Sequence, residues 1–98
     1  MWILRTTERS EAGPFTFRLM PGAIKTIGRS TTADFIVDAG MVSRFHCRLT
    51  VRQDGRIEIR DLESTNGTFV NDQRVHQGVL EPGDRVRVGR VELVVARP

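Results

Sequence analysis

The chain has one cysteine, one lysine and no long apolar run in its 98 residues. A lone cysteine cannot form a disulfide within the chain, and Cys47 stands in an alternating segment where a small buried apolar residue is expected. No apolar run approaches the roughly 20 residues that a membrane-spanning helix needs, and the N-terminus lacks a signal-peptide pattern. These absences predict a soluble, intracellular protein in the cytoplasm, or in the nucleus if the source is eukaryotic.

Helical periodicity is also lacking. Short alternating segments separated by turn residues recur along the chain, which is typical of an all-β sandwich or barrel with ten or eleven strands. The clearest hairpin joins residues 46–52 to residues 56–62 through Asp54-Gly55. The short run 34–38 is expected to be a buried strand, with Phe35 and Ile36 in the core. The length suits one domain, and we expect it to occupy residues 1–98.

The net charge of +3 comes from fourteen arginines and one lysine against twelve acids. A basic chain invites a nucleic-acid-binding interpretation. The arginines, however, are spread from Arg5 to Arg97 and interleaved with acids, without a clustered basic stripe that contains aromatics. Nucleic-acid binding therefore remains only a remote alternative, and no nucleic-acid partner is expected.

Three polar loops are the most unusual part of the chain: residues 28–30, 43–46 and 64–71. The last contains Ser64, Thr65 and an Asn66-Gly67 turn signal directly before an apolar run. Hydroxyl, amide and backbone N–H groups can point outward together at such a turn. The cluster is rich in donors and poor in acid–base groups, which predicts anion binding rather than catalysis.

A catalytic site and a metal site are two alternative interpretations of the polar residues. Ser43 and His46 resemble a nucleophile and its base only in residue type, because no Gly-x-Ser-x-Gly elbow is present. His46, Cys47 and His76 do not have the spacing of a zinc site. We therefore expect no enzyme activity, no catalytic residue, no metal and no cofactor.

The three loops together resemble the signature of the forkhead-associated (FHA) domain. The resemblance rests on Gly28-Arg29, residues 43–46 and residues 61–71 in this order and spacing, and it continues through residues 80–89. It runs from about Ile24 to Val95. It implies an FHA-type β-sandwich of about 11 short, mainly antiparallel strands whose loops at one end bind phosphothreonine in an extended peptide.

The resemblance assigns phosphopeptide contacts to five residues. Arg29 matches the arginine that binds the phosphate, and Ser43 matches a hydroxyl donor to it. Arg44 matches a position that often adds another donor. Thr65 matches a threonine on the phosphate side, and Asn66 matches the asparagine that binds the peptide main chain.

Further matches are structural. Gly28, Gly67 and Ser64 are expected to shape the loops, and His46 is expected to brace them from within without touching phosphate. One departure from the pattern is Asn71-Asp72, where Asn-Gly is common. It lies in a turn outside the anion site.

The resemblance thus implies a non-enzymatic adaptor that is a monomeric domain without membrane contact. Its partner would be a protein that a Ser/Thr protein kinase has phosphorylated on threonine. The alternative is an FHA-like structural docking domain that binds its partner whether or not it is phosphorylated. The third residue after the phosphothreonine would be read by loops around 39–42 and 71–77. There Met41 offers an apolar contact, whereas Arg44 or Arg74 would favour an acidic residue. The family also excludes phosphoserine through a niche for the threonine methyl group.

Overall fold

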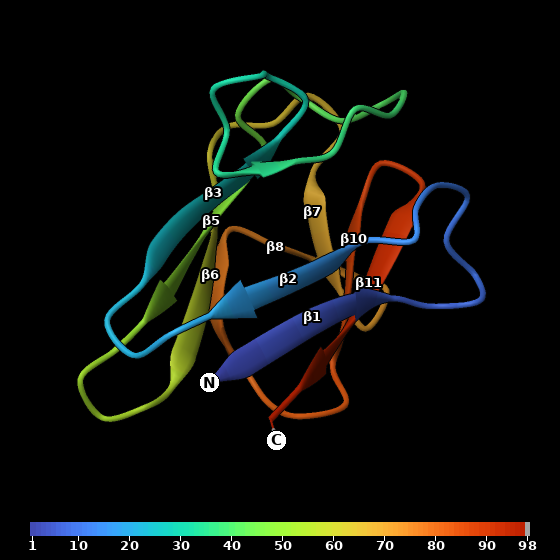
Figure 1. The fold of residues 1–98 in the computed structure, drawn as a ribbon. Helices are drawn as coiled ribbons and strands as arrows, with labels where there is room; N and C mark the ends of the chain where they lie inside the picture. Colours follow the sequence, from blue (N-terminus) through green and yellow to red (C-terminus); the bar gives the residue numbers. More distant parts are fainter. Residues whose placement is uncertain (98) are drawn as a thin grey trace.

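The computed structural model describes residues 1–97; Pro98, the last residue of the expected domain, lies outside the described residues. Eleven strands form two sheets that pack face to face, and residues 1–97 contain no helix (Figure 1). The predicted all-β sandwich of about eleven short strands is confirmed. Within this part of the chain, nothing has the length and apolar character of a membrane-crossing helix.

The first sheet has six strands and the second has five. The first has the order β2 (Thr16–Leu19), β1 (Trp2–Thr6), β11 (Val91–Ala96), β10 (Arg85–Val88), β7 (Thr68–Val70) and β8 (Gln73–Val75). The second has the order β4 (Phe35–Ile36), β3 (Ile24–Gly28), β5 (Cys47–Val51), β6 (Ile57–Asp61) and β9 (Gln77–Leu80). Neighbouring strands pair antiparallel except β3 and β4, which run parallel.

Alternation along the strands produces the core. In β5 the side chains of Cys47, Leu49 and Val51 are buried, and Leu49 lies opposite the buried Ile59 of β6. Since every second residue of a strand points to the same face, these side chains meet the other sheet. Each large aliphatic side chain buried in this way stabilises the fold by about 1.5–3 kcal/mol.

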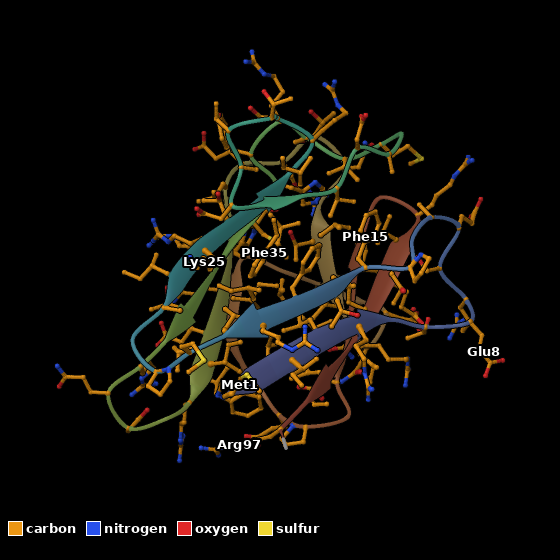
Figure 2. All side chains as sticks on the ribbon, viewed as in Figure 1. Met1, Glu8, Phe15, Lys25, Phe35 and Arg97 are labelled. Atoms are coloured by element: carbon orange, nitrogen blue, oxygen red, sulfur yellow. The ribbon has the colours of Figure 1, made fainter. Side chains whose placement is uncertain are left out.

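Two contacts connect the sheets at their margins. The ring of Phe17 stacks on Phe35, with centroids 4.4 Å apart, and joins β2 to β4. Phe15 continues the stack, and both Phe15 and Phe35 lie where the two layers meet (Figure 2). The indole N–H of Trp2 donates to the carbonyl of Gly55, at 3.0 Å, and ties β1 to the β5–β6 turn.

The turns follow the sequence signals. Gly55 has a φ of +86° in the β5–β6 hairpin, as the Asp54-Gly55 dipeptide predicted. Asn71 and Asp72 connect β7 to β8 with φ of +50° and +66°. Positive φ at both central residues is the pattern of a type I′ turn, which explains why Asn-Gly is a favourable pair there.

One core prediction was wrong. The expected buried strand 34–38 is reduced to Phe35–Ile36, and Ile36 is 43% exposed. Adjacent residues of a strand point to opposite faces, so Ile36 points away from the core against which Phe35 packs.

The loops predicted to bind gather at one end of the sandwich. In Figure 1 the segments after β3, before β5 and after β6 lie together at the top, whereas the labelled chain ends lie at the bottom. The strands thus hold three segments that are far apart in sequence at one surface.

Candidate functional site

Gly28 allows the first two loops to touch. A Cβ atom on this buried glycine would lie 2.0 Å from the carbonyl oxygen of Arg44. The contact is fixed by backbone hydrogen bonds in which Arg29 donates to Ser43, at 2.9 Å, and Ser30 donates to Arg44, at 3.0 Å. Only glycine permits this close approach of two backbones.

The side chain of Arg29 is held by a hydrogen bond at Nε, which leaves its two terminal amino groups for other partners. Its Nε–H donates to the carbonyl of Val42, at 3.1 Å. No carboxylate of residues 1–97 lies within 4.0 Å of its guanidinium. Because the carbonyl occupies only Nε, the two terminal amino groups remain available for an oxyanion, the geometry in which arginine binds phosphate best.

Ser43 connects the second loop to the third. Its Oγ accepts a hydrogen bond from the backbone N–H of Thr65, at 3.0 Å. The hydroxyl proton is therefore left to donate elsewhere. The adjacent Asn66 donates from Nδ2 to the carbonyl of Met41, at 3.0 Å, which leaves its Oδ1 to accept. Together the two side chains present a donor and an acceptor.

His46 is fully buried beneath these loops. Its Nδ1 accepts from the N–H of Ser43, at 3.1 Å, and its Nε2–H donates to the carbonyl of Gly67, at 2.8 Å. These partners require the neutral Nε2–H tautomer. Burial lowers the pKa of His46, against the opposing effects of the Gly67 carbonyl and the Asp61 carboxylate. The ring is thus a neutral brace between two loops.

Asp61 organises the third loop, although no specific role was predicted for it. Its Oδ1 accepts from the hydroxyls of Ser64, at 2.5 Å, and Thr68, at 2.7 Å, and its Oδ2 accepts from the N–H of Ser64. Burial alone would raise the pKa of Asp61, but these hydrogen bonds and His46 lower it overall. The Asp-x-x-Ser spacing was the signal that could have revealed this hub.

Gly67 completes the turn of the third loop. Its φ is +89°, and the Ser64 hydroxyl oxygen accepts from its N–H at 3.0 Å. The guanidinium of Arg74 on β8 packs so closely over it that a Cβ would lie 2.7 Å from Nε. The positive φ favours glycine here, and a Cβ would also displace the flexible Arg74 side chain.

The structure joins Arg29, Ser43, Thr65 and Asn66 at one surface through the contacts above. Arg44 enters this network through its carbonyl, and its side chain is exposed. Gly28, His46, Ser64 and Gly67 lie beneath or beside that surface. The supporting carbonyls of Met41 and Val42 were missed, because backbone groups leave no signal in side-chain identity.

The remaining reactive side chains give no support for catalysis or metal binding. Burial raises the pKa of Cys47 to about 12, so its thiol stays protonated at neutral pH. Among residues 1–97, no group of three or more His, Cys, Asp or Glu side chains is arranged to hold a metal ion.

Comparisons with known proteins agree with this geometry. A family model described as "FHA domain" matches residues 25–89. The chain is 44% identical over 84 residues to the ABC transporter ATP-binding/permease protein Rv1747 of Mycobacterium tuberculosis, covering 86% of this chain and 10% of that protein. It is 42% identical over 69 residues to the oxoglutarate dehydrogenase inhibitor of Corynebacterium diphtheriae, covering 70% of this chain and 48% of that protein. The chain therefore spans half or less of these curated relatives.

Solved structures give the same family. The FhaA FHA domain, complexed with the intracellular domain of Rv3910, matches with a TM-score of 0.84 at 33% identity, over 97% of this chain and 99% of that chain. A structure from a structural and functional analysis of phosphothreonine-dependent FHA domain interactions matches with a TM-score of 0.86 at 31% identity. The match covers 99% of this chain and 96% of that chain. By sequence and by fold, this chain belongs to the forkhead-associated domain family.

Proposed function

We propose that this domain is an adaptor module that binds a partner protein phosphorylated on threonine by a Ser/Thr kinase. The observation that carries the proposal is how the side chains of Arg29 and Ser43 are held. The Val42 carbonyl holds the guanidinium at Nε, and the Thr65 N–H donates to one lone pair of the Ser43 hydroxyl. Both side chains are thereby oriented with donors unused, and neither has to be reorganised before an anion arrives.

The chemistry of the ligand fits these donors. A phosphothreonine carries nearly two negative charges and three strong acceptor oxygens. Arg29 would donate to two of them, and Ser43, Arg44 and Thr65 would supply further donors. The free Oδ1 of Asn66 would accept from a main-chain N–H of the bound peptide. The site would thus recognise a phosphate attached to an extended peptide rather than a free phosphate.

The relatives support an interaction role without catalysis. One is named an inhibitor, and one solved structure concerns phosphothreonine-dependent interactions of FHA domains. We propose the same kind of role here, in the cytoplasm, with no chemical step performed by this domain. We also propose that residues 1–98 form one domain, because β1 and β11 from opposite ends of the chain pair with each other.

A degenerate phosphothreonine peptide library tests the proposal when it is measured by fluorescence anisotropy beside its unphosphorylated counterpart. We expect binding only of the phosphorylated library, and weaker binding of a matched phosphoserine library. Equal binding of phosphorylated and unphosphorylated peptides would instead favour constitutive docking. Equal binding of phosphothreonine and phosphoserine would refute a niche for the threonine methyl group.

A further inference from the structure

Three arginines extend from the third loop onto the outer face of the second sheet, and we call Arg74, Arg60 and Arg48 the basic band. Arg74 packs over Gly67 of the loop. A hollow of about 480 Å³ beside it is lined by Arg74, Ser64 and Arg60. A second hollow of about 230 Å³ is lined by Arg60 and Arg48. The two share Arg60 and Gln77, so they adjoin each other, and the first borders the third loop at Ser64.

The second half of the band is a pair of like charges. Arg48 of β5 lies directly opposite Arg60 of β6. Their strand neighbours Leu49 and Ile59 are buried, so both arginines point outward. Like charges directly opposite each other destabilise a sheet. Such an arrangement is costly for the free domain unless an anion lies over it.

The guanidinium groups of the band form no ion pair with acids of the described chain. None of the three has a carboxylate within 4.0 Å among residues 1–97. Of the acids that line the two hollows, Glu58 pairs with Arg52, at 3.3 Å, and Asp61 accepts from Ser64 and Thr68. Glu63 is the remaining one, and it is exposed. The three guanidinium groups can therefore pair with acids of a bound molecule.

We propose that the basic band binds an acidic segment of the same phosphorylated partner, so that the preferred ligand is a phosphothreonine flanked on one side by aspartate or glutamate. This inference rests on the proposed function, because the band adjoins the third loop of that site. An acidic peptide fits better than a nucleic acid. Neither hollow is lined by a Phe or Trp on which a base could stack.

The test compares three phosphothreonine peptides by fluorescence anisotropy: a neutral one, one with three glutamates N-terminal to the phosphothreonine, and one with three glutamates C-terminal to it. Each is measured with the wild type, with Arg48→Gln/Arg60→Gln, and with Arg18→Gln as a control arginine on β2. We expect one acidic tail to strengthen binding roughly fivefold, the combined size of two exposed ion pairs. High salt should abolish that gain.

The double variant should bind the neutral peptide as the wild type does and lose the gain from the tail, while the Arg18→Gln control keeps it. A gain that survives in the double variant, or no gain from either tail, overturns the inference and leaves the proposed function intact. Failure of the wild type to bind even the neutral peptide overturns the proposed function itself. Preferential binding of a single-stranded oligonucleotide that depends on Arg48 and Arg60 would replace the acidic peptide with a nucleic acid.

Discussion

The imidazole of His46 donates from Nε2 to the carbonyl oxygen of Gly67, at 2.8 Å, across a sequence separation of 21 residues. Its other nitrogen accepts from the N–H of Ser43. One buried ring thus connects the loop that carries Ser43 to the loop that carries Asn66. The binding surface depends on a side chain that lies beneath it.

Stability should depend on pH through this ring. The pKa of His46 is lowered by burial, so between the folded pKa and the ordinary value of 6.5 the unfolded chain binds more protons than the folded one. The contribution is fully present above about pH 6.5 and is lost as the pH falls toward the folded pKa. Urea unfolding without ligand from pH 8 to 5.5 should show a falling free energy of unfolding.

His46→Asn removes the titrating group and provides the comparison. We expect this variant to be less stable at pH 8, because at least one buried polar group loses its partner, and to show a smaller decrease over the same pH range. An unchanged decrease in the variant would show that another group causes it.

Gly28→Ala should disrupt the contact between the first two loops. The added Cβ would lie 2.0 Å from the Arg44 carbonyl oxygen, a backbone atom that cannot move without breaking the Ser30 hydrogen bond. We expect a loss of about 3 kcal/mol or more in unfolding free energy, at or above the usual range for overpacking.

Gly78→Ala is the matched control on β9. No atom lies within 4 Å of its added Cβ, and its φ is not positive. It should be neutral or slightly stabilising, because alanine restricts the unfolded chain more than glycine does. If both alanine variants were equally stable, the close approach at Gly28 would not matter.

Asp61→Asn should weaken the third loop. The amide can still accept at one oxygen, but it loses the charge that strengthens the hydrogen bonds from Ser64 and Thr68. We expect a loss of about 2 kcal/mol in unfolding free energy and weaker phosphopeptide binding. Asp54→Asn, at the far β5–β6 turn, should leave binding unchanged. Normal phosphopeptide affinity in Asp61→Asn would remove Asp61 from the account of the site.

The β7–β8 turn offers a stabilising change. Asp72 has a φ of +66° and makes only long ion pairs, at 4.0 Å to Arg85 and 3.9 Å to Arg87. Asp72→Gly should therefore raise the unfolding free energy by about 0.5 kcal/mol through relief of the left-handed backbone. Thermal unfolding measures the change.

The neighbouring Asn71 should behave in the opposite way. Its side chain donates to Asp84 and accepts from the N–H of Arg85, both at 3.0 Å. Asn71→Gly loses both hydrogen bonds and should destabilise the domain, although its φ is also positive. A stabilising effect at Asn71, or a destabilising one at Asp72, would contradict this account of the turn.

Much of the fold could be predicted from the sequence because its signals are local. Alternation identified β5 and β6, and the Asp54-Gly55 dipeptide identified their turn. The expectation that Phe35 and Ile36 both lie in the core was wrong, because adjacent strand residues point to opposite faces. Sheet order and the parallel β3–β4 pair likewise come from long-range packing that no short window encodes.

The candidate site also combines local features that the sequence shows with long-range contacts that it does not show. The turn signal pointed to the donors of the third loop, and the resemblance to the forkhead-associated signature pointed to Arg29, Ser43 and Asn66. The carbonyl of Val42 that orients Arg29 could not be found in this way. The interactions that prepare the site come from backbone groups and from the half-buried carboxylate of Asp61.

The central claim is that Arg29 binds the phosphate of a phosphothreonine peptide. The most direct measurement is the affinity of one selected phosphothreonine peptide, by titration calorimetry, for the wild type, Arg29→Ala and the control Arg18→Ala. The account predicts a loss of about 2–5 kcal/mol in Arg29→Ala, the cost of removing one partner of a hydrogen-bonded charge pair, and no loss in Arg18→Ala. Affinity that is unchanged in Arg29→Ala, with phosphorylated and unphosphorylated peptides bound alike, would contradict it.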